Sequence, residues 1–405
     1  MPLPKMVKVR QHFPAPEIKD IPMAIHHTLK DKAVLSLINE GDNVAIAVGS
    51  RGVAAISIIV RELVQALKGV GANPFIVPAM GSHGGATAEG QRGVLEHLGV
   101  TEENVGAPIR ATMDVEQLGQ LENGLPVYMD KLAFQADKIV VVNRIKPHTA
   151  FRGKWESGLM KMITIGLGKQ KGAEAAHQYG FKYMADHVPQ MATIALSKAP
   201  IVFGLAILEN AFDKTAFIEA IASDEIANRE RDLLKLAKEL MPQIKFNPLD
   251  VLVVDEIGKD ISGDGMDPNI SGRFPTPYAD GGIDAKRVVV LDLTEKTNGN
   301  ANGIGLADLI TRKAFDKIDL SQGYANALTS TVVDTVKIPM ILDSDKLAIQ
   351  AAIKTCNAFD FNKIRLVRIK HTLDIGEIWI SESLLEEARG RSDISLLSEV
   401  PVQLI

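Results

Sequence analysis

Two histidines of this chain stand in turns that could place an imidazole in a ligand cavity. His83 has glycines on both sides, at positions 81 and 84, and His148 directly follows Lys146-Pro147. An imidazole titrates near neutral pH, so two of them facing one cavity would suit general acid and base catalysis. From the residues alone, two unrelated loop histidines are an equally good interpretation.

The segment after His148 carries an amine and a further imidazole. Lys161 lies within the apolar run Leu-Met-Lys-Met-Ile (159–163). Burial in such surroundings lowers the pKa of a lysine and makes its amine nucleophilic, although a lysine can also extend its long side chain to solvent. His177 follows in an alanine-rich stretch that predicts a helix.

The elements that must position these residues are of α/β type. Short, continuous apolar runs alternate with amphipathic segments, which predicts buried, mainly parallel strands connected by helices. The predicted strands are Val44–Val48, Phe75–Val77, Ile139–Val142, Ile201–Leu208, Val251–Val254 and Val288–Leu291. The predicted helices include Ala54–Leu67, Thr87–Leu98 and Ala216–Leu240, and Ile364–Ile380 is expected to form a terminal hairpin or edge pair.

Polar residues and glycines gather after the predicted strands, where open α/β sheets bind their ligands. The first strand is followed by Gly49-Ser50-Arg51-Gly52. A glycine turn that opens a helix offers backbone N–H groups to a phosphate or a carboxylate, so we expect a pocket for an anionic small molecule. Neither this turn nor the turn at 81–85 matches G-x-G-x-x-G or a Walker A pattern, and a plain tight turn stays an alternative.

Composition places the chain among ordinary globular proteins. Its 405 residues are 46% hydrophobic and 23% charged, and its net charge of −5 provides no basic footprint for nucleic acid. Cys356 is the single cysteine, which excludes an intrachain disulfide and a cysteine-based metal site. No signal peptide or membrane-spanning run is found, so we expect a cytoplasmic protein with neither nucleic-acid nor membrane partners.

A domain boundary is predicted within the segment from Met241 to Pro248. This segment contains two prolines, follows a long charged helix and precedes a new buried strand. We therefore expect an N-terminal catalytic and cofactor-binding α/β domain at 1–247 and a C-terminal α/β domain at 248–405. The second domain would close over the substrate, with a cleft between the two.

Taken together, the motifs resemble those of the nickel-dependent lactate racemase family. Met80–His83 is similar to the family's small-residue turn ending in its first catalytic histidine, and Lys146–Phe151 resembles the segment that carries the second. Ser157-Gly-Leu-Met-Lys161 resembles the family's Ser-Gly-x-x-Lys. The 16-residue step from Lys161 to His177 agrees with the family's spacing between cofactor anchor and metal ligand.

The resemblance implies a two-domain racemase or epimerase of a 2-hydroxy acid that uses a nickel-pincer nucleotide. It implies that Lys161 joins the cofactor through a thioamide, that His177 ligates nickel, and that His83 and His148 face the substrate from opposite sides. The cofactor phosphate would lie on the turn of Ser50, Arg51 and Gly52. The proteins that mature the cofactor are implied partners, whereas neither the particular acid nor the oligomeric state follows.

The chain departs from the family pattern mainly on the substrate side. The arginine turn lacks the family's acidic residue, Thr and Pro around Arg51, and Lys154-Trp155-Glu156 lengthens the gap between His148 and Lys161. The family's Gln-Ala-Val-Lys segment corresponds here to Gly265–Arg273. We expect Arg51, Asn269 and Arg273 to bind the substrate, with Arg273 replacing the lysine charge.

Two other functions are compatible with the same fold class. An NAD-dependent 2-hydroxy acid dehydrogenase would share the hydride chemistry. It requires G-x-G-x-x-G after the first strand, where this chain has Gly-Ser-Arg-Gly-Val-Ala. A non-catalytic nucleotide- or nickel-binding protein would hold the cofactor without turnover.

Overall fold

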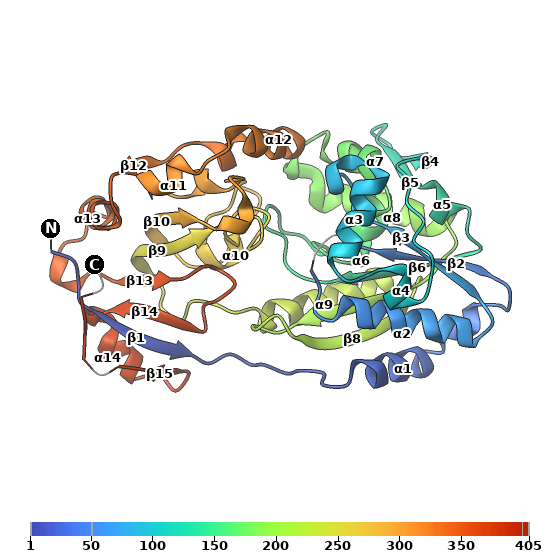
Figure 1. Ribbon diagram of the computed structural model, residues 1–405, viewed down its shortest axis with the longest axis horizontal. Helices are drawn as coiled ribbons and strands as arrows, with labels where there is room; N and C mark the ends of the chain where they lie inside the picture. Colours follow the sequence, from blue (N-terminus) through green and yellow to red (C-terminus); the bar gives the residue numbers. More distant parts are fainter. Residues whose placement is uncertain (1, 50–51, 399, 404–405) are drawn as a thin grey trace. The chain divides into compact units, whose positions relative to one another are not determined.

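The protein is a mixed α/β molecule with two compact units. The computed structural model describes residues 2–49, 52–398 and 400–403, with 38% helix and 24% strand (Figure 1). The N-terminal unit comprises Ala15–His148 and Arg152–Met241, and the C-terminal unit comprises the chain up to Pro14, Thr149–Phe151 and the chain from Pro242 onward. The sequence prediction instead divided the chain once, between residues 247 and 248.

A five-stranded sheet forms the centre of the N-terminal unit. Its order is β3 (Asn73–Pro78), β2 (Asn43–Val48), β6 (Lys138–Arg144), β7 (Ile201–Glu209) and β8 (Thr215–Ala222). The first four strands are parallel and β8 is antiparallel to β7. The parallel strands coincide with four predicted ones, and their continuous apolar runs are buried. One hydrophobic core joins this sheet to α1 (Ile21–Asp31), α2 (Ile56–Gly69) and α3 (Ala88–His97).

The predicted helix Ala216–Leu240 is wrong in its first third. Residues Thr215–Ala222 form the edge strand β8, and only Ile226–Leu240 forms a helix, α9. The apolar positions of residues 215–222 are compatible with both the helical and the strand period. This segment forms a strand because it pairs with β7 along most of its length.

The C-terminal unit contains an eight-stranded sheet that includes the first strand of the chain. Its order is β12 (Met340–Leu342), β11 (Leu309–Thr311), β10 (Ala285–Leu293), β9 (Leu249–Ile257), β13 (Leu366–Ile369), β14 (Glu377–Ser381), β1 (Met6–Gln11) and β15 (Ile394–Leu396). The strands from β12 to β13 are parallel. β13 and β14 are antiparallel neighbours, which confirms the predicted hairpin, but the pair does not lie at an edge because β1 and β15 continue the sheet. β1 lies beside β14 (Figure 1).

The residues of interest between β6 and β7 lie on a nearly continuous series of helices. These are α6 (Leu159–Lys161), a π-helical turn (Met162–Gly166), α7 (Lys169–His177), a short 3₁₀ turn (Phe181–Tyr183) and α8 (Met184–Lys198). A π-turn inside a helix is rare and is frequently found at functional sites. It lies against the end of β3, because a Cβ at Gly166 would be 2.8 Å from the Ala79 carbonyl oxygen.

The other elements complete the two units. In the N-terminal unit they are α4 (Glu102–Val105), β4 (Val115–Gln120), β5 (Pro126–Asp130) and α5 (Lys131–Phe134). In the C-terminal unit they are α10 (Pro268–Ser271), α11 (Arg312–Asp316), α12 (Leu320–Ser330), α13 (Asp345–Thr355) and α14 (Leu385–Arg389). No helix in the described part of the chain has both the length and the apolar character to cross a bilayer.

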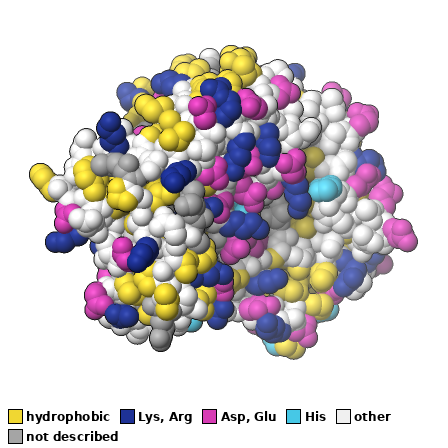
Figure 2. Space-filling view, turned by 60° about the vertical axis from the view of Figure 1, so that its left-hand side comes forward, with side chains coloured by type: hydrophobic (Ala, Val, Ile, Leu, Met, Phe, Trp, Pro, Cys, Tyr) yellow, Lys and Arg dark blue, Asp and Glu magenta, His cyan; other side chains and the backbone are white. Residues whose placement is uncertain are grey.

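On the face in Figure 2, acidic and basic side chains are interspersed.

Candidate functional site

The structure brings His148 and Lys161 into direct contact within the N-terminal unit. The loop after β6 returns to the start of α6, and its base is closed by Lys146 and Ser157. Their backbone N–H and carbonyl groups pair at 2.8 and 3.2 Å. The Lys161 ammonium donates to His148 Nε2 at 2.7 Å. The His148 ring therefore has its lone pair on Nε2 and its proton on Nδ1.

A buried carboxylate fixes the backbone from which Lys161 extends. Glu230 of α9 is fully buried, and its Oε2 accepts the Met160 N–H at 2.9 Å at the start of α6. Burial raises the pKa of Glu230 to about 7, against the opposing effect of backbone hydrogen bonds from Met160 and Leu159. Gly158 lies against this carboxylate, since a Cβ there would be 2.6 Å from Glu230 Cδ. This contact explains why glycine stands three residues before Lys161.

His177 lies at the end of α7 and approaches the same place. Its Nδ1 lies 2.7 Å from the Ala173 carbonyl oxygen, so Nδ1 carries the proton and Nε2 has the lone pair. Burial lowers the pKa of His177 below its usual value, and the nearby Lys161 charge lowers it further. The Phe181 ring packs edge-on against His177, with centroids 5.4 Å apart, and lies 5.9 Å from His148. Phe181 thus links the two imidazoles.

The turn that carries His83 packs against the same helical series. Gly81 has a φ of +60°, and a Cβ there would lie 3.3 Å from the Ile165 carbonyl oxygen and 3.6 Å from Ala173 Cβ. His83 Nδ1 lies 2.8 Å from the Met80 carbonyl oxygen, which again leaves the lone pair on Nε2. The ring is exposed, so it is accessible to a small molecule.

A buried ammonium organises the residues behind His83. Lys169 is fully buried, and its Nζ lies 3.0 Å from Asp130 Oδ2 and 2.9 Å from Gln91 Oε1, and also contacts the Pro78 carbonyl oxygen. Gln91 Nε2 in turn donates to the carbonyl oxygens of Gly81 at 2.8 Å and His83 at 3.3 Å. Burial lowers the pKa of Lys169 and raises that of Asp130, while their mutual attraction opposes both shifts.

The glycine turn after β2 is only partly described. Ser50 and Arg51 lie outside the described residues, and a Cβ at Gly52 would meet open space. Just beyond, Glu209 at the end of β7 accepts the Ala54 N–H at 2.7 Å and forms an ion pair with Arg144 at the end of β6. Charged groups therefore gather at the carboxyl ends of these parallel strands, as the sequence predicts.

The two other predicted substrate residues belong to the C-terminal unit. Arg273 follows α10 and donates to Asp308 at 2.7 Å and to the Ala285 carbonyl oxygen at 2.9 Å. These partners lie at the amino ends of β11 and β10, whereas sheets of this type bind ligands at the carboxyl ends. The N–H and side-chain amide of Asn269 both donate to Asp267 Oδ1 at 2.9 Å. A substrate role for Arg273 and Asn269 stays a prediction.

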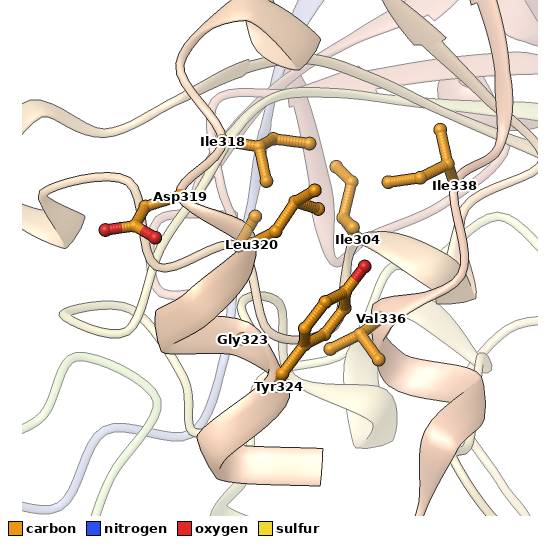
Figure 3. Close-up of a pocket in the computed structure, with 9 residues that line it drawn as sticks. Ile304, Ile318, Asp319, Leu320, Gly323, Tyr324, Val336 and Ile338 are labelled. Carbon is orange, nitrogen blue, oxygen red and sulfur yellow. The ribbon is translucent and has the colours of Figure 1, made fainter.

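A pocket in the C-terminal unit offers different chemistry. It lies between α12 and the segment before β12, and its lining includes Ile304, Leu320, Tyr324 and Ile338 (Figure 3). The carboxylate of Asp319 points away from these apolar side chains and accepts the Ser321 N–H at the start of α12. This pocket therefore provides an apolar surface rather than an acid–base pair.

Several groups that shape the site were missed from the sequence. Glu230 had a usable signal, since it falls in the apolar stripe of α9 with Ile226, Leu233 and Leu234. A charged residue at a core position of an amphipathic helix indicates a buried partner. Lys169 gave no such signal, because Lys-Gln-Lys at 169–171 resembles an exposed helix start. No group of three or more His, Cys, Asp or Glu side chains among the described residues is arranged to hold a metal.

The chain matches a known family in sequence and solved structures in fold. The family model described as lactate racemase N-terminal domain matches residues 6–187. The lactate racemase apoprotein from Thermoanaerobacterium thermosaccharolyticum aligns with 91% of this chain and 98% of its own, at 14% identity and a TM-score of 0.55, which shows a shared fold. A structural-genomics protein from Thermotoga maritima aligns with 67% of this chain and 69% of its own, at 14% identity and a TM-score of 0.48. No curated protein sequence matches.

Proposed function

We propose that this chain, which belongs to the lactate racemase family, is a racemase or epimerase of a 2-hydroxy acid that works with a nickel-pincer nucleotide. The family and the fold support a racemase-type function. One observation carries the proposal that this site uses a nickel-pincer nucleotide. The Lys161 amine contacts His148 Nε2 at 2.7 Å, and Phe181 packs against both His148 and His177. An amine and two imidazoles then meet at one place.

The residues fit the cofactor by their donor atoms. Lys161 would anchor it through its amine, and His177 would ligate nickel through Nε2, which is the lone-pair nitrogen because Nδ1 bonds the Ala173 carbonyl oxygen. Such a second hydrogen bond, which fixes tautomer and ring orientation, is typical of metal-ligating histidines. The lowered pKa keeps His177 neutral and able to bind at lower pH than a free imidazole, and imidazole suits nickel.

Inversion at C2 of a 2-hydroxy acid requires removal of hydrogen from one face and its return to the other. Loss of a proton from C2 is disfavoured because the adjacent carboxylate is already negative. The cofactor, when bound, supplies a hydride acceptor, which no side chain provides. The protein must still move the hydroxyl proton on either side of the carbon, and His83 and His148 are the residues we assign to this task.

The contact between Lys161 and His148 adds a further element to this proposal. Without the cofactor, the Lys161 ammonium donates to the lone pair of His148 Nε2 at 2.7 Å. A thioamide at Lys161 would carry no positive charge and a single N–H on its nitrogen. With the ammonium charge gone, His148 Nε2 would be better able to take the substrate's hydroxyl proton, so we expect attachment of the cofactor to favour the role of His148 as a base.

The experiment is chiral analysis of the protein made with and without the cofactor-maturation proteins. We expect the matured protein to racemise at least one of lactate, malate, glycerate, phenyllactate and sugar acids, and to carry a mass adduct at Lys161. Lys161→Ala should lose the adduct, whereas Lys171→Arg, at an exposed position of α7, should retain adduct and activity.

Each alternative function gives a different result in this experiment. Cofactor bound without turnover of any acid would favour the non-catalytic alternative. NADH-dependent reduction of a 2-oxo acid would favour the dehydrogenase. Absence of both nickel and adduct in the matured protein would refute the proposed cofactor.

A further inference from the structure

The loop that carries His148 holds a buried carboxylate, Glu156. Glu156 has no exposed side-chain surface although it stands in a loop of polar sequence. Its Oε2 accepts the His148 N–H at 2.8 Å, and its Oε1 accepts the Lys238 ammonium of α9 at 2.7 Å. A loop carboxylate is seldom buried unless it is paired with a positive charge or accepts hydrogen bonds.

Arg152 completes this arrangement through the carbonyl group of His148. Its Nη1 donates to the His148 carbonyl oxygen at 2.6 Å and lies 3.3 Å from Glu156 Oε2. Both backbone polar groups of His148 are thus satisfied by one ion pair. The Gly153 N–H, at 3.5 Å, also faces Glu156 Oε1.

The neighbouring residue Trp155 anchors the same loop to α9. Trp155 Nε1 donates to the Ala227 carbonyl oxygen at 2.7 Å. Trp155 and Glu156 therefore attach the loop to two sites on one helix, near its start and near its end. The same helix supplies Glu230, which fixes the start of α6 and hence Lys161.

We propose that Glu156 is a positioning residue for His148, holding its backbone so that the imidazole reaches the Lys161 nitrogen. The effect of Glu156 on turnover rests on the proposed function, whereas its ordering of the His148 loop holds whatever the protein catalyses.

The test combines an apoprotein readout with a kinetic one. Glu156→Ala removes a charge-assisted hydrogen bond to His148, so amide hydrogen exchange at His148 should accelerate about tenfold. Glu156→Gln keeps one acceptor oxygen but loses the charge that Arg152 and Lys238 require, and should give an intermediate acceleration of about threefold. In the matured protein, kcat should fall in the same order while KM stays within about twofold, as expected when a base is misplaced but substrate binding is retained.

Glu219 provides the matched control, because it is also a buried carboxylate joined to two basic side chains, Lys32 at 2.9 Å and Arg229 at 2.8 Å. Glu219→Ala should leave exchange at His148 and kcat unchanged. The proposal is overturned if Glu156→Gln, or Glu156→Ala where it folds, changes His148 exchange no more than Glu219→Ala does. A wild-type protein that turns over no acid would refute the proposed function, and the exchange result would still decide the role of Glu156.

Discussion

His83 and His148 both follow parallel strands, but the buried groups that order their surroundings carry opposite charges. Behind His83 stands the ammonium of Lys169, connected to the turn by the amide of Gln91. Beside His148 stands the carboxylate of Glu156, and Glu230 has the corresponding position for Lys161.

The difference follows from which backbone groups each turn leaves without a partner in regular structure. The His83 turn directs carbonyl oxygens inward, those of Gly81 and His83, and these need donors. The His148 loop and the start of α6 direct the N–H groups of His148 and Met160 inward, and these need acceptors, while the His148 carbonyl oxygen accepts from Arg152. Buried donors therefore stand where carbonyl oxygens point inward, and buried acceptors stand where N–H groups do.

The largest expected effect comes from removing the cation behind His83. Lys169→Met leaves Asp130 buried without its counter-charge, which should cost about 3–5 kcal/mol in the free energy of unfolding, measured by urea denaturation of the apoprotein. Lys317→Met, at a half-exposed lysine paired with Asp292 and Glu295, should cost less than about 1 kcal/mol. If both variants lost the same free energy of unfolding, burial of the Lys169–Asp130 pair would not increase its contribution to stability.

Glu230, which fixes the start of the helix carrying Lys161, should make the stability of the protein depend on pH. The pKa of Glu230 is raised in the folded state to about 7, so the stability it contributes is full below about pH 4.5 and is lost as pH rises through 7. Glu230→Gln stays neutral throughout. Its stability relative to wild type should therefore increase by about 3 kcal/mol between pH 4.5 and pH 8 in denaturation series.

Glu377 is the control for this pH series. Its pKa is lowered to about 2 by hydrogen bonds from Lys8 and Arg10, so it does not titrate above pH 5. The difference between Glu377→Gln and wild type should be constant from pH 5 to pH 8. A Glu230→Gln difference that is equally constant would mean that Glu230 is ionised in the folded protein.

A smaller effect is expected from cutting the link between Lys169 and the His83 turn. Gln91→Ala leaves the ammonium without one acceptor and two carbonyl oxygens without their donor, which should cost about 2 kcal/mol and accelerate amide exchange across residues 80–86. Exchange at His148 should not change. Parallel acceleration in both turns would contradict the separation of the two supports.

The smallest effect is expected at the glycine beside Glu230. Gly158→Ala places a methyl group against the carboxylate, at a cost of about 1–2 kcal/mol. The double variant Gly158→Ala/Glu230→Ala makes room for that methyl group, so the two costs should not add. Strict additivity in the double-mutant cycle would show that the methyl group meets some other atom.

The sequence predicted the buried parallel strands well, because each is a continuous apolar run bounded by turn residues. It failed at β8, where Thr215–Ala222 satisfies both periods and the partner strand decides. It also missed β1, whose pairing residues, Ile378 and Leu396 among them, stand at the other end of the chain. Patterns within a short window carry no information on such distant pairing.

The site shows the same division between local and distant information. The motif spacings singled out His148, Lys161 and His177. Lys161 contacts His148, and the Phe181 ring packs against His148 and His177, while the roles of these residues stay predictions. The supporting charges could not be found this way, because Glu156, Glu230 and Lys169 act through contacts with backbone or side chains remote in sequence. Lys169 in addition adopts a φ of +55°, a conformation that its residue type does not suggest.

The placement of β1 has a consequence for how the polypeptide can be cut and made. Residues 6–11 are synthesised long before β14 and β15, the two strands that flank them. The sheet of the C-terminal unit therefore closes only at the end of translation, after the N-terminal unit has been produced in full. A gene fragment that starts at residue 242 would lack this strand and expose two unpaired edges, so a separately expressed C-terminal unit needs residues 6–11 fused back to it.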